Sequence, residues 1–199
     1  MLDLRTVGIT GGIASGKTSV CRMLKNLGAQ VVFTDQVVHA LLVPDTNIGK
    51  RILKIVGADV VEDGKFNREK IAKRVFNSPD LLFQLEEVLH PEVYQELERK
   101  IQETLNKTPL PSLFVVEVPL LFEVGFDRLF DKTVVVVADE KLRNRRCNLI
   151  KQADFEKRSS RHLTQEEKMQ RADYILDNNG TLEELFVKTS NLYHQLTNY

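Results

Sequence analysis

The sequence is poor in cysteine, has no net charge and contains no long apolar run. Its two cysteines, Cys21 and Cys147, fit neither a metal-binding spacing nor a disulfide framework, so we expect reduced structural thiols. No apolar stretch reaches the ~18 residues of a membrane-spanning helix, and no N-terminal segment has the anatomy of a signal peptide. A cytoplasmic protein without a membrane partner is therefore expected.

The charge is balanced overall but uneven along the chain. The 199 residues carry 28 Lys/Arg and 28 Asp/Glu, so the molecule as a whole has no field suited to binding nucleic acid. Residues 141–171 nevertheless hold ten basic side chains against four acidic ones, a surplus of six. This basic block indicates a small anionic ligand more than a polymer, although a solvated helical face would have the same composition.

Apolar strands alternate with helical segments. Strands are predicted at 6–10, 30–33, 113–116, 133–137 and 174–176. Those at 113–116 and 133–137 are continuous apolar runs, a pattern typical of a parallel sheet covered by helices on both faces. Helical segments are predicted at 17–27 (closed by Gly28), between 35 and 107, between 140 and 171, and after the capping box of Thr181 and Glu184. Within the second of these, breaks are expected at Pro44 and at residues 62–64, 78–79 and 90–91.

The strongest motif is a glycine-rich string between the first predicted strand and the first predicted helix. It reads Gly-Gly-Ile-Ala-Ser-Gly-Lys-Thr and matches G-x-x-x-x-G-K-[ST], the pattern of a phosphate-binding loop. Its glycines let backbone N–H groups approach a polyphosphate, Lys17 places charge on the β and γ oxygens, and the Thr18 hydroxyl is suited to Mg²⁺. The predicted ATP-binding residues are Gly11, Gly12, Ile13, Ala14, Ser15, Gly16, Lys17, Thr18 and Ser19.

The fold that follows is a single α/β domain with a three-layer core like that of the P-loop nucleoside-triphosphate hydrolases. The core comprises about residues 1–35, 110–140 and 172–199, around a parallel sheet. One helical insert occupies about residues 36–109, and the basic block forms a second one at about 141–171.

Two acidic residues follow predicted strands, at the sheet edge where α/β proteins bind ligands. Asp35 comes just after the second strand and could orient or deprotonate an attacking hydroxyl, or equally serve as the N-cap of a helix beginning near Gln36. Glu117 ends the strand at 113–116, where an acid can hold a Mg²⁺-bound water. We predict Thr18 and Glu117 as the metal-site residues.

Arginines of the basic block suit a transferring phosphate because guanidinium groups are permanently charged and bidentate. The candidates are Arg143, Arg145, Arg146, Arg158 and Arg161. Their spacing alone does not select one of them.

With these motifs in place, the chain resembles the dephospho-CoA kinase family over nearly its whole length. The resemblance rests on residues 8–18, on Asp35 with its following helix, and on residues 63–68, 90–91, 118–123 and 172–178. The phosphate loop alone indicates only the P-loop class. The Pro-Leu-Leu-Phe-Glu string at 119–123 and the Ala-Asp-x-x-x-Asp-Asn string at 172–178 narrow the resemblance to this one family. The family implies transfer of the γ-phosphoryl group of ATP to the ribose 3′-hydroxyl of dephospho-CoA, the last step of coenzyme A synthesis.

The resemblance also implies roles for both inserts and for individual residues. The helical insert at 36–109 would bind the acceptor, and the basic block at 141–171 would be a lid. Lys17, Asp35 as the base and Arg145 as the lid arginine are the predicted catalytic residues. Asp35, His90, Leu121 and Glu123 are the predicted acceptor-binding residues. The chain departs from the family pattern at Phe33, at His39, at Leu149, where a second lid arginine is common, and at His162.

Other functions are also compatible with the phosphate loop. A P-loop kinase for another small hydroxyl acceptor would keep every mechanistic residue. A GTPase is less favoured, because guanine selection normally uses N-K-x-D and residues 106–109, Asn-Lys-Thr-Pro, lack the Asp. A nucleic-acid-dependent ATPase is also less favoured, because it would need several aromatic residues among the basic ones and the basic block holds only Phe155. A monomer or small homo-oligomer is expected.

Overall fold

The computed structural model describes residues 4–148 and 163–198. The chain divides into two compact units, one formed by the residues up to 33 and from 100 onward, the other by residues 34–99. The second unit starts near the predicted beginning of the helical insert, at residue 36, and ends before its predicted end at 109. Each unit has a hydrophobic core of its own.

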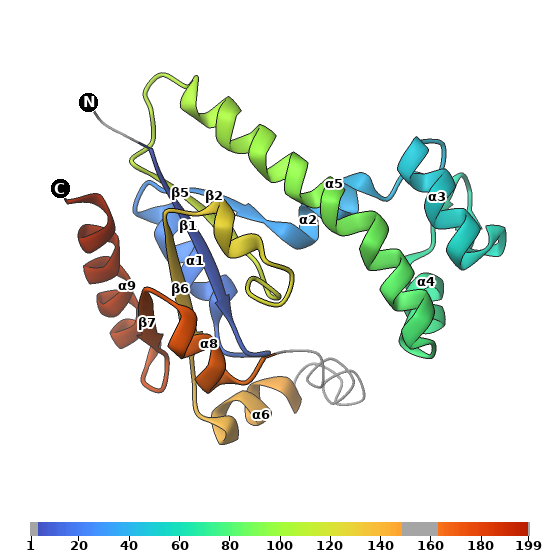
Figure 1. Ribbon diagram of the computed structural model, residues 1–199. Coiled ribbons are helices and arrows are strands. Elements are labelled where there is room, and N and C mark those ends of the chain that lie inside the picture. Colours follow the sequence, from blue (N-terminus) through green and yellow to red (C-terminus); the bar gives the residue numbers. More distant parts are fainter. Residues whose placement is uncertain (1–3, 149–162, 199) are drawn as a thin grey trace. The chain divides into compact units, whose positions relative to one another are not determined.

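The first unit is built on a five-stranded sheet in which every strand pair is parallel (Figure 1). The strands are β1 (Arg5–Gly11), β2 (Gln30–Phe33), β5 (Leu113–Glu117), β6 (Lys132–Val137) and β7 (Tyr174–Asp177), in the order β2-β5-β1-β6-β7. Each of the five predicted strands is confirmed. Because all five run the same way, their carboxyl ends share one edge of the sheet.

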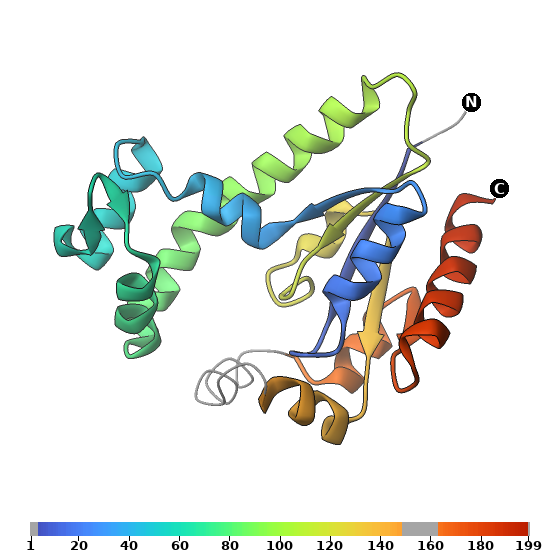
Figure 2. The same ribbon diagram turned by 180° about the vertical axis from the view of Figure 1, so that it is seen from behind.

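Helices lie on both faces of this sheet, which explains why the central strands β1, β5 and β6 are buried almost throughout. Helices α1 (Lys17–Asn26) and α9 (Leu182–Thr197) contact each other, and α8 (Gln165–Arg171) lies on the face opposite α1 (Figures 1 and 2). Helix α6 (Glu140–Asn148) follows β6, and the short 3₁₀ helix η2 spans Phe126–Leu129. The predicted α/β class with a parallel sheet is therefore confirmed.

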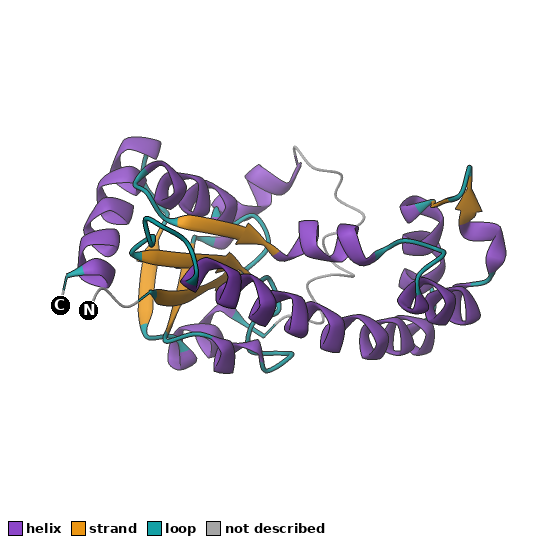
Figure 3. Cartoon of the chain, turned by 90° about the horizontal axis from the view of Figure 1, so that it is seen from above, coloured by secondary structure: helices purple, strands orange, loops and turns teal. Residues whose placement is uncertain are grey.

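The second unit is mainly helical and has its own small core (Figure 3). It contains α2 (Thr34–Leu41), α3 (Asn47–Val56), the 3₁₀ helix η1 (Ala58–Val60), α4 (Arg68–Phe76) and most of α5 (Pro79–Leu105). A hairpin of β3 (Val61–Glu62) and β4 (Lys65–Phe66) turns at Asp63 and Gly64, whose φ angles are 50° and 72°. Positive φ at both positions is the geometry that favours Asp-Gly in a tight hairpin.

One predicted helix break is wrong. The breaks at Pro44, residues 62–64 and residues 78–79 are confirmed, but α5 continues through His90 and Pro91 without interruption. A proline inside a helix costs about 3 kcal/mol, whereas burying one Leu or Val side chain contributes about 1.5–3 kcal/mol. Leu89 and Val93, on either side of the proline, are 8% and 4% exposed, so burial of the apolar stripe outweighs the local penalty.

The longest helix has no membrane character. Among the residues that the structure describes, none of the helices is both long and apolar enough to cross a bilayer.

Candidate active site

The phosphate loop joins the carboxyl end of β1 to α1, where its backbone conformation depends on glycine. Gly11 and Gly16 have φ angles of +150° and +101°. A Cβ atom on Gly11 would lie 2.2 Å from the carbonyl oxygen of Val136, and one on Gly16 would lie 2.1 Å from Nδ2 of Asn178. Ala14 also has a positive φ, 58°. The loop therefore combines left-handed backbone with close packing against β6 and the residue after β7.

Two side chains at the end of the loop, Lys17 and Thr18, make hydrogen bonds within the site. Lys17 Nζ donates to the carbonyl oxygens of Gly11 and Gly12 at 3.0 and 2.9 Å. Thr18 Oγ1 donates to Oε1 of the buried Glu117 at 3.0 Å. The structure thus brings together the two residues predicted for Mg²⁺.

These oxygens fit a magnesium ion that takes most of its ligands from phosphate and water. Mg²⁺ is usually held by one or two protein oxygens together with substrate phosphates. Within residues 4–148 and 163–198, no cluster of three or more His, Cys, Asp or Glu side chains that could hold a metal ion is found.

Cys21 lies on α1 below the loop and is fully buried. Burial raises the pKa of its thiol well above the usual value, the charge of Glu117 acts in the same direction, and Lys17 opposes them. A thiol held protonated is a poor nucleophile, as expected for a structural cysteine.

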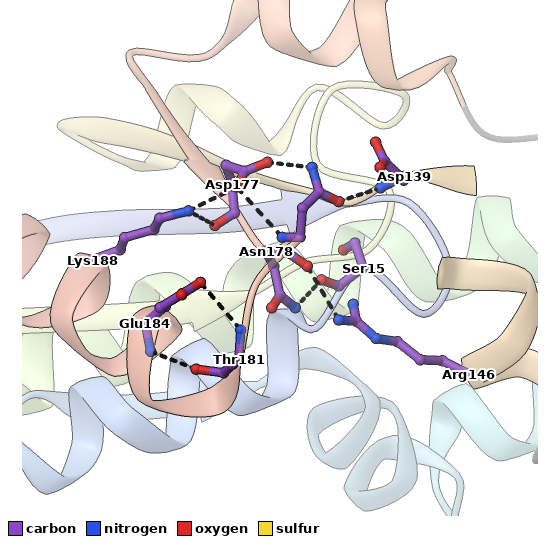
Figure 4. Close-up of polar contacts among 9 residues, drawn as sticks. Ser15, Asp139, Arg146, Asp177, Asn178, Thr181, Glu184 and Lys188 are labelled. Atoms are coloured by element: carbon purple, nitrogen blue, oxygen red, sulfur yellow. Dashed lines mark hydrogen bonds and ion pairs between the residues drawn. The ribbon is translucent and has the colours of Figure 1, made fainter. Parts of the chain in front are cut away.

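The loop is held from the far side by Asn178, as Figure 4 shows. Asn178 is 6% exposed, and its Nδ2 donates to the Ser15 carbonyl oxygen at 2.7 Å. Its backbone N–H donates to the Val137 carbonyl oxygen at 2.8 Å, and its own carbonyl oxygen accepts from Nη2 of Arg146 at 3.1 Å. The sequence marked Asn178 only as part of a family string, so its contact with the phosphate loop was missed.

The neighbouring residues form a more exposed network in the same view (Figure 4). Asn179 Oδ1 accepts from the Asp139 backbone N–H at 2.6 Å. Lys188 Nζ donates to Asp177 Oδ1 at 2.7 Å, and this hydrogen bond lowers the pKa of Asp177. The network ties the start of α6 to the turn that follows β7.

The arginines of α6 occupy different surroundings. Arg145, the predicted lid arginine, is exposed. Arg143 is half-buried, its Nε donates to the Ala138 carbonyl oxygen at 3.1 Å, and its Nη1 lies 2.8 Å from where a Cβ of Gly12 would be. Arg143 therefore places a guanidinium directly against the phosphate loop. The other candidates, Arg158 and Arg161, lie outside the described residues, as do Leu149 and His162.

The segment after β5 is anchored by a buried lysine. Lys168 of α8 is 0% exposed, and its Nζ lies 2.9 Å from Oε1 of Glu123. Burial lowers the pKa of Lys168 below its usual value, while the hydrogen bond and charge of Glu123 act in the opposite direction. Glu123 Oε1 also accepts from the Leu163 N–H at 2.9 Å. Leu121, two residues before Glu123 in the same segment, is fully buried.

The remaining predicted site residues belong to the second unit. Asp35 is exposed and lies in the first turn of α2, which already begins at Thr34. The alternative of Asp35 as the N-cap of a helix starting near Gln36 is therefore wrong. His90 is half-buried inside α5.

A parallel α/β sheet that presents a phosphate loop, with Thr18 and Glu117 beside it, defines a P-loop kinase-like nucleotide site. Solved structures share this fold. TT1252 from Thermus thermophilus superimposes with a TM-score of 0.78 at 30% identity, covering 97% of this chain and 98% of that one. A dephospho-CoA kinase from Campylobacter jejuni gives a TM-score of 0.73 at 22% identity, with 98% of each chain covered.

Sequence comparison is more specific. The pattern of the family described as dephospho-CoA kinase matches residues 5–184. The chain is also 41% identical, over 199 residues and 98% of both chains, to a protein of Chlamydia abortus named dephospho-CoA kinase. This chain belongs to the dephospho-CoA kinase family.

Because Asn178 donates to the phosphate loop, we expect its replacement to destabilise the protein more than replacement of its neighbour Asn179. Asn178→Ala should lower the free energy of unfolding by about 1–3 kcal/mol, because it leaves the buried Ser15 carbonyl without its donor. Asn179→Ala, at an exposed position, should change it by less than about 0.5 kcal/mol. Urea unfolding of both variants measures the difference, and equal effects would show that the Asn178 contact contributes little.

Proposed function

We propose that this protein transfers the γ-phosphoryl group of ATP to the ribose 3′-hydroxyl of dephospho-CoA, giving coenzyme A and ADP. The observation that carries the proposal is the phosphate loop with Lys17 and the Thr18–Glu117 pair at the sheet edge, in a chain of this family. A cytoplasmic location, a monomer or small homo-oligomer and the absence of nucleic-acid partners belong to the same proposal.

Positioning and charge neutralisation carry most of the catalysis in phosphoryl transfer. The bond from the γ-phosphorus to the β–γ bridging oxygen breaks as the bond to the acceptor oxygen forms. The Lys17 ammonium is held by two neutral carbonyls, so γ-phosphate oxygens can replace them as better acceptors. Thr18 and Glu117 would hold Mg²⁺, which supplies further neutralisation of the phosphate charge.

On the acceptor side we assign Asp35 as the group that orients the hydroxyl and receives its proton. Its exposure in the first turn of α2 leaves the carboxylate accessible to a ligand. His90 and Glu123 are assigned to acceptor binding. Leu121 joins them through packing or backbone, because its side chain has no exposed surface.

A coupled ADP-release assay with ATP and Mg²⁺ tests the function directly. Dephospho-CoA should stimulate ADP release strongly, whereas adenosine, pantothenate and no acceptor should not. Lys17→Ala should reduce turnover by about 10²-fold or more without lowering the melting temperature, because it removes charge stabilisation from the transferring group. Stimulation by another acceptor alone would favour a different small-molecule kinase, and hydrolysis without any acceptor would reject the proposal.

Asp35→Asn should act on turnover more than on binding. Loss of a general base typically lowers kcat by ~10²–10⁴-fold, while KM for both substrates should change little, because proton transfer occurs in the transition state. Steady-state kinetics with each substrate varied measures this. Normal turnover in Asp35→Asn would assign the carboxylate a purely local role in α2.

Two of the three arginines of α6, Arg143 and Arg145, can be separated by the kinetic parameter that each affects. Arg145→Lys keeps the charge but loses the bidentate fork, so kcat should fall by about tenfold or more if Arg145 contacts the transferring phosphate. Arg143→Gln should mainly raise KM for ATP, because this guanidinium already lies against the loop. If Arg143→Gln shows the larger loss of kcat, the catalytic arginine is Arg143 and the assignment from the family pattern is incorrect.

A further inference from the structure

Lys168 is completely buried and donates to acceptors on two other segments of the chain. Its Nζ lies 2.9 Å from Oε1 of Glu123, 2.8 Å from the carbonyl oxygen of Pro119 and 3.4 Å from Oγ1 of Thr10. An ammonium group has three donors, and these three acceptors match them in number. Lys168 therefore has a complete set of partners without water.

The three acceptors lie at places that matter for the site. Thr10 immediately precedes Gly11 of the phosphate loop, and Pro119 and Glu123 are the two ends of the 119–123 segment that follows β5. Thr10 Oγ1 itself donates to the Pro119 carbonyl oxygen at 3.1 Å. One buried side chain thus fixes both ends of this segment and joins it to the strand end that opens the phosphate loop.

Stability alone does not explain a lysine at this position. Taking an ammonium and a carboxylate out of water costs much of what their attraction returns, and an apolar pair of similar volume often replaces a buried ion pair without loss of stability. An apolar side chain cannot, however, specify where three oxygen atoms lie. Directional hydrogen bonds from one donor group can.

We propose that Lys168 is a positioning residue for phosphoryl transfer, which holds the 119–123 segment in the geometry that binds the acceptor. This inference rests on the proposed function, in which Leu121 and Glu123 belong to the dephospho-CoA side. Lys168 itself contacts neither substrate. It acts through Glu123, Pro119 and Thr10.

The test compares Lys168→Met with the double variant Lys168→Met/Glu123→Gln. Methionine has a similar length without charge. The glutamine neutralises the carboxylate left behind and keeps an oxygen for the Leu163 N–H. Lys132→Met is the matched control, because it removes a lysine from an exposed ion pair, 3.3 Å from Asp173. Thermal melts establish which variants are folded.

In the folded Lys168 variants, kcat/KM for dephospho-CoA should fall about 10–100-fold, while the Kd for ATP measured by calorimetry should stay within about threefold of wild type. The double variant should regain most of the melting temperature lost by Lys168→Met, while its kcat/KM should stay below that of the single variant Glu123→Gln. Lys132→Met should leave both kcat/KM for dephospho-CoA and the Kd for ATP unchanged. Recovery of kcat/KM together with the melting temperature would overturn the proposal, because it would make the role of Lys168 structural only.

Amide hydrogen exchange gives a readout that does not depend on activity. Residues 120–123 of the ligand-free protein should exchange faster in both Lys168 variants than in wild type or in Lys132→Met. Unchanged exchange there would refute the positioning role whatever the kinetics show. If wild type itself shows no ADP release dependent on dephospho-CoA, the proposed function fails, and hydrogen exchange still decides the role of Lys168.

Discussion

Close packing between the phosphate loop and the adjoining strand ends constrains the rest of the first unit. The loop has no room for a Cβ atom at Gly11, beside the Val136 carbonyl oxygen, or at Gly16, beside the Asn178 amide. Both contacts require β6 and β7 on the same side of β1, which the order β2-β5-β1-β6-β7 supplies. The sheet order and the positions of these glycines therefore depend on the same close packing. A nucleotide would bind to a loop whose conformation is already fixed by that packing.

Features with a local physical cause could be predicted from the sequence. Strands β5 and β6 were the easiest to recognise, because burial on both faces makes their sequences almost continuously apolar. The phosphate loop was recognisable because its function needs particular residue types at fixed spacing. Thr18 and Glu117 could be paired in advance, since one follows the loop and the other ends a strand at the same sheet edge. The capping box of Thr181 and Glu184 is confirmed for the same reason of locality.

Features that depend on distant partners could not be predicted. Lys168 stands among charged residues on α8, where a lysine is expected to be exposed, and its acceptors Thr10 and Glu123 lie far away in the sequence. Asn178 gave no sign of its bond to Ser15 for the same reason. At Pro91 a local signal led to a wrong prediction. Proline tends to break a helix, but α5 stays continuous because its apolar residues are buried by tertiary packing, which the sequence does not reveal.

The separate hydrophobic cores have a consequence for how this chain can change over time. Residues 34–99 form one continuous stretch, inserted between β2 and β5, which are neighbours in the sheet. Ile52, Val56 and Leu89 pack within that stretch, whereas Val7, Val115 and Val136 pack around the sheet. A substitution in one core does not have to be compensated in the other. The two units can therefore accumulate substitutions at different rates, and divergence in residues 34–99 can proceed while the phosphate loop and its supporting strands stay the same.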